Sequence, residues 1–362
     1  MKKLFFPTLV LCILVSAAAA QKLPKPTQLP SPLSAEESKT LNAGIVHHDA
    51  KRYDEAIAQY DKILSGNADA TIALYEKALS LYAKGDRDKA MEVAYLGAKY
   101  KSDELAMFYS IMANCLDDVG KSEEALKVYR EAESMLKSDI GMARHLSSVY
   151  FNIGVTYVRQ KKYNEARAEL KKAVETNFGY ASPHYLLSVV YQGTKYKIPA
   201  FAAAARFLTL EYNSQRSATA ASIITEVLKP AEKDAKTGSI NIFMDLNAPK
   251  DEGDFGMYDL LLGTLITVKD NKDKGKTENE IFVDALGTVI SLLSEDKKLG
   301  STFVGKQYVP FLAELKKKGH LESFGYMVLY ISGKKDAMKW LEANNEKFGL
   351  FLTWSKAFQP AK

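Results

Sequence analysis

Histidine and cysteine are the residues of this sequence best able to bind a metal ion, and their spacing argues against such a site. Zinc sites need ligands at short, regular spacing, such as a His-Glu-x-x-His helix or paired Cys-x-x-Cys turns. The sequence has neither pattern, and its two cysteines, Cys12 and Cys115, are far apart. The five histidines are His47, His48, His145, His184 and His320. We therefore predict no bound metal.

Acidic residues gather at two places in the C-terminal half. Residues 270–280 resemble a calcium-binding loop, but three ligand places hold Lys272, Lys274 and Ile281, so we interpret this stretch as a solvated turn. The second group precedes a predicted helix that starts at Phe255, and acidic side chains stabilise a helix N-terminus. It consists of Asp245, Asp251, Glu252 and Asp254.

Catalytic motifs are also missing from the sequence. There is no Gly-x-Ser-x-Gly nucleophile elbow and no glycine-rich phosphate loop. We predict that the chain is not an enzyme and carries no cofactor. An enzyme whose site is assembled in the C-terminal domain from residues distant in sequence remains an alternative.

Composition describes an ordinary globular protein rather than a nucleic-acid-binding one. Hydrophobic residues make up 47% and charged residues 26% of the 362 residues, and the formal net charge is +5. Two of these charges, Lys2 and Lys3, lie in a segment that we expect to be removed. Residues 236–362 carry 18 basic and 17 acidic side chains. A field that attracts phosphate backbones is absent, so nucleic acid is not the expected partner.

The first twenty residues have the pattern of a secretory signal peptide. Lys2 and Lys3 precede an apolar run over residues 4–15, and four alanines follow Ser16. Cleavage before Gln21 is predicted, and the alternative of a membrane anchor is disfavoured because a spanning helix needs ~20 apolar residues. We expect an exported protein, periplasmic or secreted, with no transmembrane span after cleavage.

We expect neither lipidation of Cys12 nor an intramolecular disulfide at Cys115. Cys12 follows Val10 and Leu11, whereas lipoprotein signals place a small residue before the acylated cysteine. The mature chain would keep only Cys115, which cannot form an intramolecular disulfide. We interpret Cys115 as a small buried apolar residue.

Beyond the signal peptide (1–20), composition divides the chain into four further segments. Prolines at positions 24, 26, 30 and 32 predict an extended tether over residues 21–33 rather than a packed element. Ser34 with Glu36 and Glu37 marks a helix start. The expected segments are 21–33, a repeat array with a capping helix at 34–231, a linker at 232–250 and a helical domain at 251–362.

A repeat of two small residues sets the register of the array. Five alanines lie 34, 35, 41 and 34 residues apart, and another small residue stands twelve positions before each. Two helices joined by a short turn approach closely only where the side chains at their crossing are small. The predicted repeat-packing residues are Gly44, Ala56, Ala78, Ala90, Ala113, Ala125, Gly154, Ala166, Ser188 and Ala200.

These segments resemble tetratricopeptide repeats over about residues 35–213. Matching glycines, Gly85 and Gly120, stand between paired helices, and the fourth repeat carries the fullest pattern. That pattern is Tyr150, Ile153, Gly154, Tyr157, Tyr163, Ala166 and Ala173. The resemblance implies an all-α fold, a tetratricopeptide-like solenoid of helical hairpins, followed by a smaller helical C-terminal domain. Single hairpins cannot bury their apolar faces, so the five must stack, and residues 218–228 are expected to cap the last one.

In this family the first helix of each pair lines the concave, partner-binding surface. Members of this family that bind the terminal carboxylate of a peptide do so with lysines and asparagines on this surface, and the lysines are missing here. Aromatic residues instead suggest a groove for a peptide, with packing between repeats as the alternative. The resulting candidate residues are Asn42, His48, Tyr75, Tyr82, Asn114, Asp118, Phe151, Asn152, Arg159 and Tyr185.

The C-terminal half continues with helical periodicity outside the 34-residue register and resembles no family. A strand or an extended linker is possible at 240–246. Trp340, Phe351, Trp354 and Phe358 are interpreted as core, or as surface that docks on the repeats or on a partner. The predicted helices are 255–268, 278–293, 303–317, 321–331 and 336–358, the last broken at Gly349.

Three functions follow as hypotheses. The leading one is an exported scaffold that binds a protein or peptide in the cell envelope, either as one chain or as a homo-oligomer. The first alternative is a carbohydrate-binding protein of a nutrient-uptake system, which would stack sugars on Trp354 or Tyr82. The second alternative is the enzyme already described.

Overall fold

The computed structural model describes residues 22–229, 250–256, 258 and 275–360. The chain divides into two compact units, Met1–Lys161 and Lys162–Lys362, called unit 1 and unit 2 below. Several predicted features fall outside the described residues and stay predictions, as do the domain boundaries. They are the signal peptide at 1–20, nearly all of the linker at 232–250, the segment 240–246, most of the helix 255–268, and residues 270–274 of the turn 270–280.

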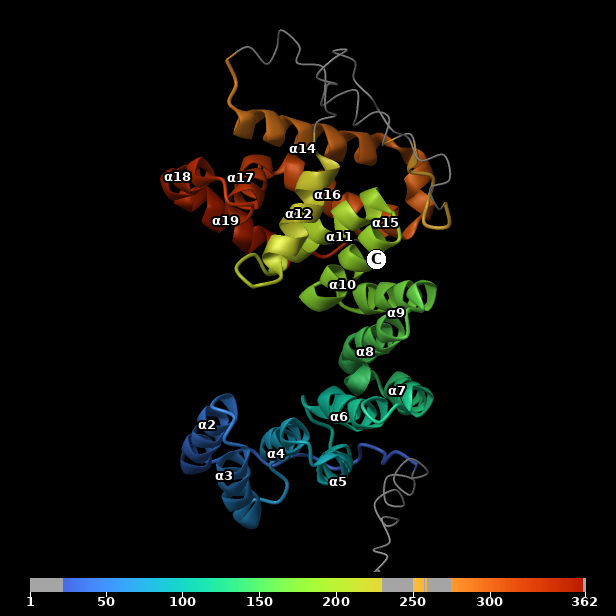
Figure 1. The fold of residues 1–362 in the computed structure, drawn as a ribbon, viewed down its shortest axis with the longest axis vertical. Coiled ribbons are helices and arrows are strands. Elements are labelled where there is room, and N and C mark those ends of the chain that lie inside the picture. Colours follow the sequence, from blue (N-terminus) through green and yellow to red (C-terminus); the bar gives the residue numbers. More distant parts are fainter. Residues whose placement is uncertain (1–21, 230–249, 257, 259–274, 361–362) are drawn as a thin grey trace, which may run out of the picture. The chain divides into compact units, whose positions relative to one another are not determined.

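Unit 1 consists of helices that pack in consecutive pairs, shown from blue to green in Figure 1. In three pairs α2 packs on α3, α4 on α5 and α6 on α7, and each pair also packs on the next. A 3-10 helix, η1, absorbs the extra residues that precede the fourth repeat. The elements are α2 (Ala35–Asp49), α3 (Tyr53–Gly66), α4 (Thr71–Lys84), α5 (Arg87–Gly97), α6 (Leu105–Asp117), α7 (Ser122–Lys137), η1 (Ile140–His145) and α8 (Leu146–Arg159).

Local signals explain where these helices begin and end. Ser34 caps α2 through a capping box with Glu37, in which each side chain accepts a hydrogen bond from the other residue's backbone N–H. Gly85 and Gly120 adopt φ angles of 93° and 79° in the turns of their pairs, a left-handed conformation that glycine accepts without strain. Lys51 takes the same conformation, with φ 60°, at the matching place of the first pair.

Small residues allow the paired helices to approach closely. A Cβ atom added to Gly44 would lie 2.4 Å from Cε1 of Tyr60 in α3, so only glycine fits there. The alanines and serine of the predicted register are 0–1% exposed, and Gly154 is buried as well. The sequence register therefore coincides with the packed side of the helices.

The proline-rich segment is extended, as predicted, but it is not a free tether. Gln28 pairs with Tyr100 in an isolated parallel bridge, in which the Gln28 N–H donates to the Lys99 carbonyl at 3.0 Å. Lys101 N–H donates to the Gln28 carbonyl at 2.8 Å. The prediction of an unpacked segment was wrong here because prolines leave the intervening backbone groups free to pair with the loop between α5 and α6.

Further contacts attach both ends of this segment to unit 1. Leu23 is 6% exposed, and its N–H donates to Oε1 of Glu131 in α7. Ser31 N–H donates to the carbonyl of Asp69, in the loop between α3 and α4. The segment thus runs across three repeats and joins them.

Unit 2 surrounds one helix with the others. Residues 198–209 of α11 are all buried, and α10, α12, α16 and α19 pack on this helix. Alanines fill much of the stretch, and their small size lets helices approach from every side. The helices are α9 (Tyr163–Thr176), α10 (Ala181–Gly193), α11 (Lys197–Leu210), α12 (Ser217–Val227), α14 (Glu278–Glu295), α15 (Phe303–Gln307), α16 (Val309–Lys317), α17 (Leu321–Ile331), α18 (Lys335–Ala343) and α19 (Asn345–Ala357), with the 3-10 helix η3 at Lys297–Ser301.

Two predicted helices are divided differently in the structure. The helix expected at 303–317 splits into α15 and α16 because Pro310 favours a new helix start. The helix expected at 336–358 breaks at Asn344, whereas Gly349 lies inside α19. The helices expected at 278–293 and 321–331 correspond to α14 and α17.

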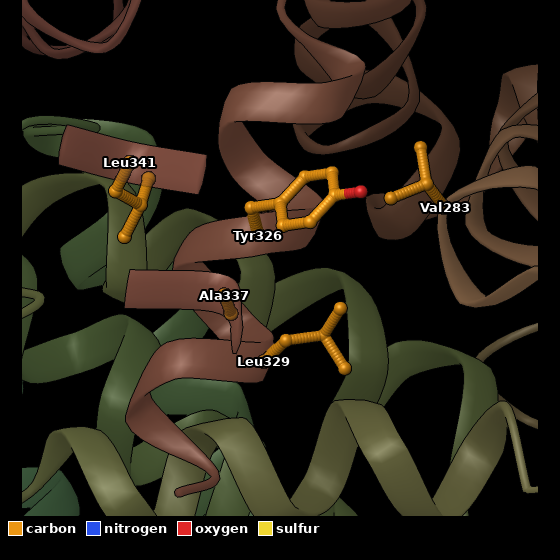
Figure 2. Close-up of a cluster of buried hydrophobic side chains, with 5 residues drawn as sticks. All are labelled: Val283, Tyr326, Leu329, Ala337 and Leu341. Atoms are coloured by element: carbon orange, nitrogen blue, oxygen red, sulfur yellow. The ribbon is translucent and has the colours of Figure 1, made fainter. Parts of the chain in front are cut away.

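The C-terminal helices share an apolar cluster of their own, shown in Figure 2. Val283 of α14 faces Tyr326 and Leu329 of α17, and Ala337 and Leu341 of α18 complete the cluster.

The predicted all-α fold class, helical hairpins followed by further helices, is confirmed.

Candidate functional site

The candidate residues lie mainly on the first helices of the pairs in unit 1. Asn42, Asp118 and Arg159 are exposed, and the other seven are partly buried. We call the partly exposed side of α2, α4, α6 and α8 the first-helix face. Tyr185, on α10, belongs to unit 2 and is therefore separate from this face.

Three of these residues belong to one polar group at the C-terminal ends of α4 and α6. The Tyr82 hydroxyl donates to Oδ2 of Asp118 at 2.9 Å, and Arg87 Nη2 donates to the same oxygen at 3.2 Å. Burial, followed by the bond to Asp118, raises the pKa of Tyr82 to about 12. Tyr82 is therefore a neutral hydrogen-bond donor at physiological pH.

Arg159, the third, binds the carboxylate next to Asp118. Its Nη1 lies 2.7 Å from Oδ2 of Asp117, whose side chain is 8% exposed, and Ser122 donates to the other oxygen of Asp117. Two carboxylates at the end of α6 oppose the helix dipole. The two arginines offset that repulsion and link neighbouring repeats of unit 1.

Other candidates are occupied by contacts between helices. His48 Nδ1 lies 2.7 Å from the Ser80 hydroxyl, and Asn152 donates to Ser110. Tyr75 meets Phe108 edge-on, with ring centroids 6.3 Å apart. Among the candidates these three contribute to packing between repeats, which was the alternative to an aromatic groove.

Tyr185 is also a packing residue, within unit 2. Its ring lies 5.1 Å from that of Phe207, and the Arg216 guanidinium stacks on it at 5.2 Å. Asn42, Asn114 and Phe151 complete the ten candidates: Asn42 is exposed, while Asn114 and Phe151 are partly buried. The residues that the structure brings together are therefore Tyr82, Asp118 and Arg159.

Sequence reasoning missed Glu76, which stands beside Tyr75 on α4. Its carboxylate is partly buried, and burial, followed by Asp49 of α2, raises its pKa. Glu76 and Lys77 interrupt an otherwise apolar stretch of α4, and this interruption was the available signal.

The acidic group near Phe255 has a different role from the one predicted. Asp251 binds Arg167 of α9 at 2.9 Å, and Glu252, which is 5% exposed, binds Lys171 at 2.9 Å. These two carboxylates tie their segment to α9 rather than capping a helix. Asp254 does accept a bond from the backbone of Gly256, as a helix-start residue would, and Asp245 lies outside the described residues.

The C-terminal aromatic residues pack inside unit 2. Phe351 is fully buried, and Trp354 stacks on Phe311 with centroids 5.6 Å apart. Trp340 stacks on Tyr326 at 4.3 Å, and Phe358 contacts Phe178 at 6.0 Å. Phe351 is therefore a core residue, whereas Trp340, Trp354 and Phe358 are partly buried and pack on neighbouring rings.

The part of the chain that the structure describes contains no group of three His, Cys, Asp or Glu side chains placed to hold a metal ion. Nor does it contain a helix with both the length and the apolar character needed to cross a membrane.

Fold and site together define a helical-repeat protein of tandem hairpins. The sequence model of the tetratricopeptide repeat family matches residues 147–179. This match confirms the prediction of tetratricopeptide repeats at residues 147–179, and proteins of this repeat family are typically non-catalytic scaffolds for protein–protein interaction. No curated protein sequence matches the chain.

Solved structures of other repeat proteins are similar to parts of this chain. A thermophilic TPR protein of Thermus thermophilus is 19% identical, with a TM-score of 0.40, and the match covers 52% of this chain and 98% of that one. PilF of Pseudomonas aeruginosa is 17% identical, with a TM-score of 0.40 and coverage of 53% and 83%. The C-terminal part of a TPR repeat-containing protein from Cytophaga hutchinsonii is 11% identical, with a TM-score of 0.35 and coverage of 83% and 99%.

Proposed function

We propose that this chain is an exported scaffold that binds a protein partner of the cell envelope on the first-helix face of unit 1. The observation that carries the proposal is this face itself. Asn42, Asp118 and Arg159 are exposed on it beside partly buried apolar residues, a mixture typical of surfaces that hold peptides. Export rests on the signal pattern of residues 1–20.

The C-terminal helices have a supporting role in this proposal. An array of repeats needs a cover over its last apolar surface. In unit 2 this cover includes α16 and α19 as well as the predicted capping helix α12. We assign these helices to stabilising the array rather than to a separate activity.

A pull-down tests the proposal. Three immobilised proteins are incubated with extract of the source cells, and the retained proteins are compared. They are the chain starting at Gln21, its variant Asn42→Arg on the first-helix face, and its variant Ala58→Arg on the exposed side of α3. Wild type and Ala58→Arg should retain the same protein, and Asn42→Arg should lose most of it. Failure to recover any specific protein, from extract and from crosslinked cells, would refute the proposal.

Export has its own test. Fractionation of the source cells should place the processed chain, beginning at Gln21, outside the cytoplasm. An unprocessed chain that remains in the cytoplasm would refute the envelope part of the proposal and leave partner binding standing.

No observation favours the carbohydrate-binding alternative. It needs free aromatic faces, yet one face of Trp354 is covered by the stacked ring of Phe311.

A further inference from the structure

Unit 1 differs from a plain repeat array in one long-range element. In such arrays each repeat contacts only its neighbours along the chain. Residues 22–33, called the strap, instead contact the loop between α3 and α4, the loop between α5 and α6, and α7. Leu23 and its acceptor Glu131 stand 108 positions apart in the sequence. The strap therefore links the first three helix pairs to one another.

The strap is held mainly through its backbone. Besides the bridge to the loop between α5 and α6, the Tyr95 hydroxyl donates to the Lys22 carbonyl and Asn67 Nδ2 donates to the Pro32 carbonyl, each at 3.2 Å. The four prolines of the strap fix their φ angles in the unfolded chain as well, which lowers the conformational entropy lost when the strap docks. These features favour docking of the strap as one extended unit.

The first helix pair is the part of the array that most needs such a link. Among the described residues no helix precedes α2. Ala43 and Val46 of α2 are exposed, Val46 to 62%, whereas the terminal repeats of such arrays normally have a cap with a polar outer face. A pair that packs on a neighbour on one side only opens more readily than the rest of the array.

The strap contacts this first pair where it joins the second. Leu33, at the end of the strap, packs against the buried cluster that Ile63 of α3 forms with α4. Ser31 N–H donates to the Asp69 carbonyl at 3.0 Å, and the Tyr100 hydroxyl donates to Oδ1 of Asp69. The junction between the first two pairs is thereby bound both to the strap and to the loop that precedes the third pair.

We propose that the strap acts as a clamp in place of an N-terminal capping helix. When docked, it holds α2 in one position relative to α4 and α6, so that the first-helix face keeps a single curvature. When detached, it lets the first pair open. A change at Leu23, which is bonded to α7, should therefore loosen α2, two pairs away. The inference concerns the conformation of unit 1 and goes beyond the proposed function, on which it does not depend.

Distances between two spin labels, measured by pulsed electron paramagnetic resonance, test the clamp. The labels are attached at Asn42→Cys on α2 and Met107→Cys on α6, which are both exposed positions. Cys115 is 2% exposed and should stay unlabelled. The width of the distance distribution then reports how firmly α2 is held relative to the third pair.

Four labelled proteins are compared: the chain starting at Gln21, its variants Leu23→Asp and Leu29→Asp, and a chain starting at Leu33. Leu29 is the matched control because it lies on the same strap and is 75% exposed, against 6% for Leu23. Circular dichroism checks that each protein keeps the wild-type helix content. If the shortest chain does not fold, the two point variants decide the outcome.

The chain starting at Gln21 and Leu29→Asp should give the same narrow distribution. Leu23→Asp should give a distribution about twice as wide, and the chain starting at Leu33 should give a wider one still, because the first pair opens once the strap is released. Equal widths for Leu23→Asp and Leu29→Asp would overturn the inference and leave the proposed function standing.

Hydrogen exchange separates a clamp from a local anchor. In Leu23→Asp the backbone amides of α2 and α3 should exchange about tenfold faster than in wild type, and those of α14, in unit 2, should keep their wild-type rate. Faster exchange confined to α7, which holds Glu131, would mean that Leu23 stabilises only the helix it contacts. That result would also overturn the inference.

Discussion

The second helices of the pairs are used differently in the two units. In unit 1, α5 buries one side, at Ala90, Val93, Ala94 and Gly97. In unit 2, α11 is buried continuously over residues 198–209, under α12, α16 and α19 as well as α10 (Figure 1). The same register of small residues thus yields an open pair in one unit and an enclosed pair in the other.

The enclosed helix α11 has a buried charged residue, whereas the buried residues of α5 are all uncharged. Arg206 is fully buried, and its guanidinium donates to the carbonyls of Phe178, Ser355 and Phe358. It also stacks on the ring of Phe178 at 4.5 Å. Burial lowers the pKa of Arg206 to about 9. The negative ends of helix dipoles take the place of a counter-ion here, since Ser355 and Phe358 lie at the end of α19.

Arg206→Met should therefore produce the largest loss of stability. It leaves three buried carbonyls without donors, at about 1–3 kcal/mol each, so we expect at least about 3 kcal/mol in urea unfolding. Lys306→Met, at an exposed position of α15, is the control and should change little. If both variants unfold at the same urea concentration, the enclosed helix does not depend on its buried charge.

Overpacking an open pair should have a smaller effect. Ala90→Leu places a larger side chain at the crossing of α4 and α5, where Ala90 is 0% exposed, and should destabilise by about 1–3 kcal/mol. Ala58→Leu, on the exposed side of α3, should be close to neutral. Equal unfolding midpoints for the two variants would contradict the register of the array.

The enclosed unit should respond to mild acid through His184. Its Nε2 lies 3.0 Å from the Phe178 carbonyl and its Nδ1 2.9 Å from the Tyr308 hydroxyl. Burial, and then Arg206, lower its pKa from the ordinary 6.5 to about 3. Below pH 6.5 the unfolded chain binds a proton at His184 that the folded chain does not bind. The free energy of unfolding is therefore highest above pH 6.5 and decreases as the pH falls below it.

This group alone contributes about 1.4 kcal/mol for each pH unit between these two pKa values. Urea unfolding of wild type and His184→Gln at pH 7.5, 6.5, 5.5 and 4.5 measures the slope. The variant should lose less stability than wild type on acidification. Parallel slopes would show that His184 is not held neutral.

Backbone strain should give the smallest effect. Gly85→Ala forces a side chain into a left-handed turn and should cost about 1 kcal/mol. Lys51→Ala, at the same place in the first pair, should be near neutral because a side chain is already accommodated there at φ 60°. A matching loss in both variants would assign the effect to something other than the turn conformation.

The helix pairs of unit 1 could be predicted from the sequence, whereas the burial of α11 on all sides in unit 2 could not. Local spacing fixed the crossings at Gly44 and Ala90 because those contacts join helices adjacent in the chain. Arg206 meets Ser355 and Phe358 about 150 positions later, and no local pattern reports such contacts. The attachment of Leu23 to Glu131 was missed for the same reason.

The candidate site was predicted in part. Register placed Tyr82, Asp118 and Arg159 on first helices, and these form one polar group. It could not separate exposed side chains from packing ones such as Tyr75, because both recur at the same helical spacing. Glu76 was missed because its raised pKa follows from burial, which only the packed structure reveals.

Site-specific photocrosslinking in the source cells tests the central claim most directly. A photoreactive amino acid is placed at Asn42 or Leu79 on the first-helix face, and at Ala58 or Glu92 on the second helices. Binding on the first-helix face predicts one common protein adduct from Asn42 and Leu79 and none from Ala58 and Glu92. Adducts from the second-helix positions alone, or from none of the four, would contradict it.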